Sequence, residues 1–315
     1  MTTAVVFAYS EVGVRCLREL LAQGVRVALL FTHADDANES QWFGSVQQLA
    51  REFAIEAQTP ESPNSPQWLS QAAAIRPDFV FSFYYRHMLD SAWLALPARG
   101  ALNMHGSLLP KYRGRAPVHW AIIQGETETG ASLHYMVEKP DAGALVDQQA
   151  VAILEDDDAL QVSLKVAAAA EQVLRRSLPG LISGTAAAQP LDLTRGSYFG
   201  RRRPEDGRIN WRLSARSVHD LVRAVAPPFP GAFTDLAGLR LGIHKTEVDR
   251  LPVKWAAQAP CLYASDGAWY ADCVDGRRLK ILQLTVNGQP VAHNSVPAAL
   301  SSQPLALDAA QLIEV

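Results

Sequence analysis

The sequence has only three cysteines, Cys16, Cys261 and Cys273, and they lie far apart. They form no C-x-x-C pair, so the sequence predicts neither a zinc knuckle nor a disulfide framework. Buried cysteine behaves as a small hydrophobe, and we interpret all three as core residues. This use of cysteine favours a reducing cytoplasm.

Long apolar stretches are also missing. No run approaches the roughly 20 residues that a membrane helix needs. The first residues lack the basic segment and cleavage site of a signal peptide and instead indicate a strand at Val5–Tyr9. We therefore expect a cytoplasmic protein without membrane insertion.

An excess of basic charge and the glycine-rich loops that bind nucleotides are absent as well. The net charge of −3 gives no reason to expect nucleic acid as the main partner. The segment after the first strand, Ala8–Gly13, lacks the G-x-G-x-x-G pattern, and no Walker loop occurs, which argues against NAD and ATP. The eight histidines show no metal-ligand spacing, so no metal is expected.

The N-terminal half alternates strand-like and helix-like segments. Alternation at this spacing predicts an α/β fold, a mostly parallel sheet with helices on both faces. The expected strands are Val5–Tyr9, Val25–Phe31, Phe79–Phe83 and Ala101–His105, and the expected helices are Glu11–Gln23, Phe43–Phe53 and Ser65–Ile75. Ligands of such sheets bind at the carboxyl ends of the strands.

The pattern changes after residue 128. Extended runs at Thr129–Val137 and Ala144–Ile153 flank a turn-like segment, and a helix is expected over Ala159–Leu178, ended by Pro179-Gly180. A polar stretch then marks a boundary, which we place between a catalytic domain at 1–200 and a second domain at 201–315. Short β-like runs after a helix at Ser214–Val225 predict a small open β-barrel, OB-like, for the second domain.

The most informative segment runs from Asn103 to Pro117. Asn103 and His105 lie two apart at the end of a predicted strand, so their side chains share one face. An amide can donate to an oxyanion, and an imidazole can exchange a proton near neutral pH. A structural histidine and a turn-capping asparagine would give the same pattern, and the sequence leaves both interpretations open.

Asp141 lies in the turn between the two extended runs, Val137–Gly143. By itself it is an ordinary turn aspartate. If the fold brought it near His105, it would hold the ring and favour the protonated form.

These residues resemble the folate-dependent formyltransferases. The resemblance rests on the Asn-x-His-Gly-Ser-Leu-Leu-Pro element and the later Asp-Ala-Gly loop, and it covers about 300 residues. It is strongest toward enzymes that formylate UDP-4-amino-4-deoxy-L-arabinose in lipid A modification and cationic peptide resistance. Further shared segments are Phe81–His87, Gly125–Gly130, Phe199–Arg202 and Pro230–Phe233.

The resemblance implies a Rossmann-like first domain without NAD, and a role for each site residue. Asn103 would stabilise the oxyanion, His105 would handle the proton, and Asp141 would favour protonated His105. The pterin of 10-formyltetrahydrofolate would lie against the main chain at His87, Met88 and Leu89 and at Val137, Glu138, Lys139, Pro140 and Asp141. Arg115 would contact the acceptor. The fused relatives also carry an NAD-dependent dehydrogenase half that does not follow Val315 here, so no oxidative step is expected.

The acceptor is the open question. The segment Thr32–Gln41 has three acidic residues and no Lys or Arg, which argues against tRNA, the acceptor of the methionyl-tRNA formyltransferases. The run Arg201–Arg203 is the opposing observation, and it could equally be a solvated face. A sugar diphosphate needs only one or two arginines, for which Arg115, Arg202 and Arg203 are candidates, with Tyr112 packing on the base or sugar.

Four hypotheses follow: a formyltransferase for UDP-4-amino-4-deoxy-L-arabinose or another nucleotide-linked aminosugar, a methionyl-tRNA formyltransferase, a formyltetrahydrofolate hydrolase, and a non-catalytic folate-binding module. The intact set of Asn103, His105 and Asp141 argues against the last. The oligomeric state is not indicated by the sequence.

Overall fold

The computed structural model describes residues 1–35, 41–236, 238–249, 260–291 and 305–307. The chain divides into two compact units. Unit 1 comprises Met1–Val118, Glu128–Ala152 and Val162–Arg201, and unit 2 comprises His119–Thr127, Ile153–Gln161 and Arg202–Val315. The sequence predicted one boundary, after residue 200. In the structure, the earlier segments His119–Thr127 and Ile153–Gln161 also belong to unit 2.

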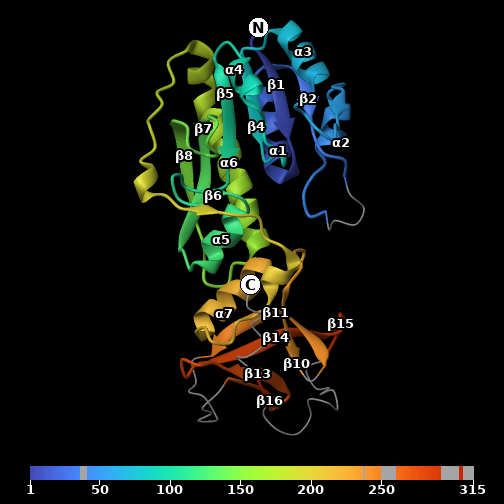
Figure 1. The fold of residues 1–315 in the computed structure, drawn as a ribbon, viewed down its shortest axis with the longest axis vertical. Coiled ribbons are helices and arrows are strands. Elements are labelled where there is room, and N and C mark those ends of the chain that lie inside the picture. The colour runs from blue at the N-terminus through green and yellow to red at the C-terminus, as the bar shows by residue number, and fades with distance from the viewer. Residues whose placement is uncertain (36–40, 237, 250–259, 292–304, 308–315) are drawn as a thin grey trace. The chain divides into compact units, whose positions relative to one another are not determined.

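Unit 1 is built on a seven-stranded sheet in the order β3-β2-β1-β4-β5-β7-β8 (Figure 1). Its strands are β1 (Thr3–Ala8), β2 (Arg26–Phe31), β3 (Ala57–Gln58), β4 (Phe79–Phe83), β5 (Gly100–His105), β7 (Glu128–Tyr135) and β8 (Leu145–Ala152). The first five in spatial order are parallel, and β7 and β8 are antiparallel to their neighbours. The predicted mostly parallel sheet is confirmed.

Helices cover both faces of this sheet. The helices with residues in unit 1 are α1 (Ser10–Ala22), α2 (Val46–Glu52), α3 (Pro66–Ile75), α4 (Ser91–Ala95), α5 (Pro117–Ile123) and α6 (Ala159–Ser183). On one face, Phe7 of β1 belongs to an apolar cluster that includes Trp93 of α4 and is packed against by Trp68 of α3. On the other face, Ala8 lies against Gly13 of α1, because successive strand residues point in opposite directions.

The prediction that Pro179-Gly180 ends helix α6 is wrong. The helix continues to Ser183 with Pro179 inside. Proline has no N–H to donate to the carbonyl four residues earlier, which here belongs to Arg175. The side chain of Gln23 supplies the missing donor, because its Nε2 lies 3.0 Å from the Arg175 oxygen. Gln23, the residue that follows helix α1, therefore donates to the Arg175 carbonyl the hydrogen bond that Pro179 cannot donate.

Helix α2 is shorter than predicted. It begins at Val46, after Ser45 caps it by accepting from the Gln48 N–H at 3.2 Å, so residues 43–45 lie before the helix. Residues 36–40 of the acidic segment fall outside the described residues, and the prediction made for that segment remains a prediction.

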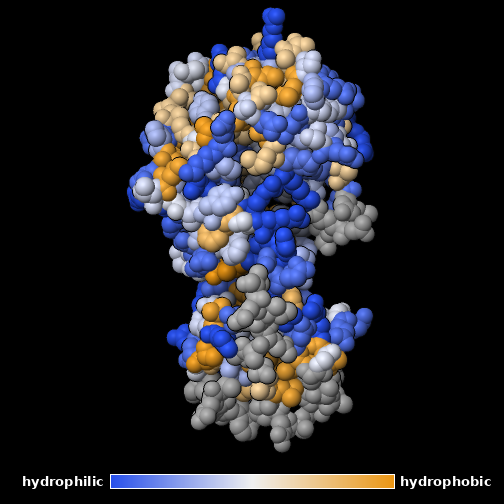
Figure 2. All heavy atoms as spheres, in the orientation of Figure 1, coloured by the Kyte–Doolittle hydropathy of each residue, from blue (hydrophilic) through white to orange (hydrophobic). Residues whose placement is uncertain are grey.

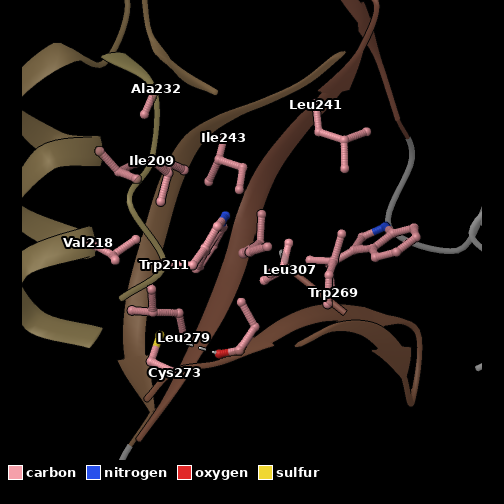
Figure 3. Packing of buried hydrophobic residues seen from close by; sticks show 14 of the residues in the cluster. Ile209, Trp211, Val218, Ala232, Leu241, Ile243, Trp269, Cys273, Leu279 and Leu307 are labelled. Atoms are coloured by element: carbon pink, nitrogen blue, oxygen red, sulfur yellow. Dashed lines mark hydrogen bonds between the residues drawn. The ribbon is translucent and has the colours of Figure 1, made fainter. Parts of the chain in front are cut away.

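Unit 2 contains a curled antiparallel sheet in the order β10-β11-β14-β13-β12-β16, with β15 paired to β14. Its strands are β10 (Ala232–Leu236), β11 (Leu239–Asp249), β12 (Cys261–Ser265), β13 (Ala268–Asp272), β14 (Arg278–Val286), β15 (Gln289–Pro290) and β16 (Leu305–Ala306). Helix α7 (Ala215–Val225) begins after Ser214, whose Oγ accepts from the Ser217 N–H. In Figure 3, Val218 of α7 and Trp211 face the core formed by Ile243 and Leu279. This fold agrees with the predicted small open barrel.

The surface of unit 1 mixes polar and apolar side chains on the face seen in Figure 2. Among the described residues, no helix combines the length and apolar character that a membrane crossing would require.

Candidate active site

Two predicted side chains, Asn103 and His105, converge on one carboxylate oxygen of the third, Asp141, in unit 1. Asn103 and His105 are the first and third of the last three residues of β5, so both lie on the same face of the strand. Asn103 Nδ2 lies 3.4 Å from Asp141 Oδ1, and His105 Nδ1 lies 3.5 Å from the same oxygen. The proximity of Asp141 to His105, which the sequence left conditional, is confirmed.

Asp141 is held by the backbone of its own turn and of a second loop. Its φ of +50° is left-handed, a conformation that Asp and Asn tolerate better than most residues. Gly143 follows, and a Cβ there would overlap the Tyr135 carbonyl, so the turn closes only with glycine. The Gly114 N–H donates to Asp141 Oδ2 at 2.8 Å. The carboxylate is thus fixed from two directions.

The environment keeps Asp141 ionised. Burial raises the pKa of this carboxyl, but the adjacent His105 and the Gly114 N–H more than offset that effect. The net result is a pKa well below the ordinary value for aspartate. Asp141 is therefore a permanent negative charge beside the His105 ring at neutral pH.

The loop after β5 positions the other side of His105. The short strand β6 (Arg113–Gly114) pairs with β9 (Tyr198–Phe199). This pairing attaches the loop to a segment of unit 1 that lies much later in the sequence. His105 Nε2 lies 2.8 Å from the Tyr112 carbonyl oxygen, which can only accept. Nε2 therefore carries a proton, and Nδ1, facing Asp141, is the nitrogen that can gain or lose one.

The side chain of Tyr112 is predicted to pack on the acceptor, and that contact stays a prediction. Its side chain is buried and its ring stacks on Phe199 with the ring centres 5.3 Å apart. The feature of Tyr112 that reaches the site is its carbonyl group.

The segments predicted to hold the carrier place apolar side chains at the surface. Met88 and Val137 are 55% and 47% exposed. Asn64 fixes the first segment, because its side chain donates to the Met88 carbonyl at 3.0 Å and accepts from the Asp90 N–H at 3.1 Å. His87, Leu89 and the segment from Glu138 to Pro140 lie in these same two loops. Their contacts with a carrier stay predictions.

The candidate acceptor arginines belong to both units. In unit 1, Arg115 donates to the Arg86 carbonyl at 2.7 Å. In unit 2, the Arg202 guanidinium lies 4.9 Å from the centre of the Trp120 ring and donates to the Asp206 carbonyl. Burial lowers the pKa of Arg202, opposed by Asp206. Arg203 bonds Asp206 through its main-chain N–H, and its side chain is exposed.

Sequence reasoning missed Ser132 and His134 on β7. They pair directly with His105 and Asn103 across the sheet, so the candidate site has four polar residues on two neighbouring strands. Ser132 Oγ donates to the Ser107 carbonyl and accepts from the Leu109 N–H, which fixes the turn after β5. The available signal was the alternation of apolar Ala131 and Leu133 with polar Ser132 and His134 near the end of the strand.

The chain matches two family models. The formyl transferase model matches residues 5–178, and the formyl transferase C-terminal domain model matches residues 202–296. Together they span both units, and the first alone covers more than half of the chain. The chain therefore belongs to the formyl transferase family, and it has both the catalytic and the C-terminal domain.

Solved structures with this fold include sugar-modifying enzymes. The N-formyltransferase from Helicobacter canadensis, in complex with folinic acid and dTDP-3-aminofucose, aligns with a TM-score of 0.71 at 18% identity, over 92% of this chain and 100% of that one. WlaRD, a sugar 3N-formyltransferase with dTDP and 5-N-formyl-THF, aligns with a TM-score of 0.69 at 16% identity, over 92% of this chain and 98% of that one. A 4-N formyltransferase from Francisella tularensis aligns with a TM-score of 0.59 at 16% identity, over 74% of this chain and 91% of that one. At these identities the likeness establishes a common fold.

Proposed function

We propose that this enzyme transfers the formyl group of 10-formyltetrahydrofolate to the 4-amino group of UDP-4-amino-4-deoxy-L-arabinose. The observation that carries the proposal is the convergence of Asn103 and His105 on the ionised Asp141 at the end of β5. This set supplies an amide donor, a proton carrier and a charge that stabilises the protonated carrier. The C-terminal domain completes the family architecture.

The reaction is an acyl transfer between two nitrogens. The acceptor amine attacks the formyl carbon, and the carbonyl oxygen becomes an oxyanion to which Asn103 Nδ2 donates. A proton leaves the attacking nitrogen. The bond between the formyl carbon and N10 then breaks, and N10 receives a proton. The products are the formamide and tetrahydrofolate. His105 Nδ1 carries the proton, and Asp141 stabilises the imidazolium during the transfer.

The formyl donor is 10-formyltetrahydrofolate, and the pterin binds between the loops that carry Met88 and Val137. Their exposed apolar side chains provide surface that a flat heterocycle can cover. Main-chain groups of the segments 87–89 and 137–141 supply the hydrogen bonds. Asn64 supports this arrangement, since it holds the Met88 carbonyl in a fixed orientation.

A nucleotide-linked aminosugar is the acceptor class favoured by the solved relatives, two of which are described with dTDP or a dTDP-sugar. Arg115 and the arginines at 202 and 203 are the candidates for its diphosphate. The choice of uridine and of 4-amino-4-deoxy-L-arabinose, and with it a place in lipid A modification, rests on the sequence resemblance. Another nucleotide-linked aminosugar would use the same chemistry. A cytoplasmic location remains part of the proposal.

A turnover assay tests this function. The purified protein is mixed with 10-formyltetrahydrofolate and, in separate reactions, with UDP-4-amino-4-deoxy-L-arabinose, a dTDP-4-aminosugar, initiator methionyl-tRNA or no acceptor. Tetrahydrofolate is followed by absorbance and the product by mass. We expect a formylated UDP-sugar and no product with tRNA. Formylated tRNA would overturn the acceptor class, and folate turnover without acceptor would indicate a hydrolase.

A further inference from the structure

His134 is a buried polar residue that the proposed mechanism does not use. It lies on β7, is 1% exposed, and is the cross-strand partner of Asn103. Its Nε2 lies 3.1 Å from Asn103 Nδ2 and 3.5 Å from Asp141 Oδ1. A buried imidazole that contacts two members of a proposed catalytic set needs an explanation beyond filling space.

The contacts of the ring define its tautomer. Nδ1 lies 2.8 Å from the Tyr135 carbonyl oxygen, an acceptor, so Nδ1 carries a proton. Nε2 faces the Asn103 amide nitrogen, a donor, and therefore offers its lone pair. With this tautomer Nε2 cannot donate to Asp141, so the carboxylate is stabilised by His105, the Asn103 amide and the Gly114 N–H.

The same contact fixes the orientation of Asn103. An asparagine amide can rotate to exchange its oxygen and nitrogen, and only the nitrogen can donate to an oxyanion. The Nε2 lone pair accepts from Nδ2 and would repel the amide oxygen. One Nδ2 hydrogen is thereby bound to His134, and the second points to Asp141 over a long 3.4 Å contact. That second, weakly held hydrogen is the one that a developing oxyanion can capture.

We propose that His134 is a positioning residue that acts through Asn103, keeping the amide nitrogen toward the reacting carbonyl with one hydrogen available. This inference rests on the proposed oxyanion role of Asn103. It predicts that His134 matters for the transition state and little for substrate binding, because the oxyanion exists only during the reaction.

A double-mutant cycle tests the proposal. His134→Phe keeps a ring but removes the acceptor, and His134→Gln keeps an acceptor. We expect His134→Phe to lower kcat by about 10-fold or more, up to the 10²–10³-fold loss typical of removing an oxyanion donor. The KM for 10-formyltetrahydrofolate should be unchanged, and His134→Gln should recover several-fold of the lost rate. In an Asn103→Ala background, His134→Phe should cause no further loss.

Each other outcome has a distinct meaning. Equal losses from His134→Phe in both backgrounds would overturn the positioning role while leaving the proposed function intact. Full activity of Asn103→Ala would instead reject the proposed catalytic role of Asn103. If His134→Phe does not fold, the tautomer decides: ¹⁵N NMR of the histidine-labelled wild-type protein should show a proton on Nδ1 of His134 and none on Nε2. A proton on Nε2 would overturn the proposal.

Discussion

The carbonyl oxygen of Tyr112 lies 2.8 Å from Nε2 of His105, seven residues earlier in the chain. Tyr112 has a left-handed φ of +57°, and its N–H donates to Ser197 Oγ at 2.8 Å. The segment 197–199, which contains β9, therefore holds the Tyr112 backbone in place. The Tyr112 carbonyl in turn determines which nitrogen of His105 faces Asp141.

Removing the Ser197 hydroxyl should lower the rate without changing carrier binding. A hydrogen bond of this kind contributes about 1 kcal/mol, so Ser197→Ala should reduce kcat by about threefold to tenfold as Tyr112 loosens. Steady-state kinetics with the folate donor measure the effect. Ser183→Ala, on the exposed end of α6, is the matched control. Equal kcat values for the two variants would contradict the proposed role of Ser197 in holding the Tyr112 backbone.

The depressed pKa of Asp141 predicts a defined pH dependence of stability. A carboxyl whose folded pKa lies below its unfolded value stabilises the protein above the unfolded pKa of about 4, and this contribution is lost as the pH falls further. Asn tolerates the positive φ, so Asp141→Asn removes the charge with little backbone strain. The difference in unfolding free energy between wild type and variant should be constant from pH 8 to pH 5 and should shrink below pH 4.

Urea unfolding at pH 7, 5 and 3 measures that difference. A difference that is as large at pH 3 as at pH 7 would mean that the pKa of Asp141 is not depressed. Because the carboxylate stays charged at working pH, any acidic limb in the wild-type activity profile should not arise from Asp141.

Gly106 should tolerate no side chain. A Cβ at this position would overlap the hydroxyl oxygen of Tyr84, whose own φ of +58° restricts its movement. Gly106→Ala should destabilise the protein by about 1–3 kcal/mol, the usual cost of overpacking. Gly200→Ala is the control, because no atom lies within 4 Å of a Cβ built there. Thermal unfolding of both variants makes the comparison, and similar melting temperatures would contradict the predicted clash.

Arg115 should contribute to acceptor affinity if it contacts the diphosphate. Arg115→Ala should raise the KM for the sugar nucleotide by about 10-fold to 100-fold, as expected for the loss of a charged hydrogen bond of about 1.5–3 kcal/mol. The KM for the folate donor should not change. Arg51→Ala, at an exposed position of α2, provides the control. An unchanged acceptor KM in Arg115→Ala would remove this residue from the acceptor site.

The proline inside α6 predicts a role for Gln23. Gln23→Leu would leave the Arg175 carbonyl without the side-chain donor that replaces the absent proline N–H. We expect a loss of about 1–2 kcal/mol in the free energy of unfolding, with activity retained at temperatures where the protein is folded. If the loss arises at the proline, Gln23→Leu should cost less in a Pro179→Ala background, where residue 179 can donate to that carbonyl.

Much of the site could be predicted because short-range patterns encode it. The spacing of Asn103 and His105 fixes their common face once β5 is a strand, since side chains alternate along any strand. The apolar runs of β1, β2 and β4 likewise predict buried parallel strands wherever they pack. The turn around Asp141 is evident from Pro140 and Gly143, since both residues favour turns.

The sequence by itself determined the strands, the turns and the residue types available for chemistry. Only the tertiary structure decided which of them meet. His134 joins Asn103 through strand pairing, and Gln23 reaches Arg175 across 152 positions of the chain. The ring of Tyr112 is buried while its carbonyl faces the site, because β6 pairs with β9. Local propensity acts over a few residues, whereas hydrogen-bond partners and burial depend on which segments the folded chain brings together.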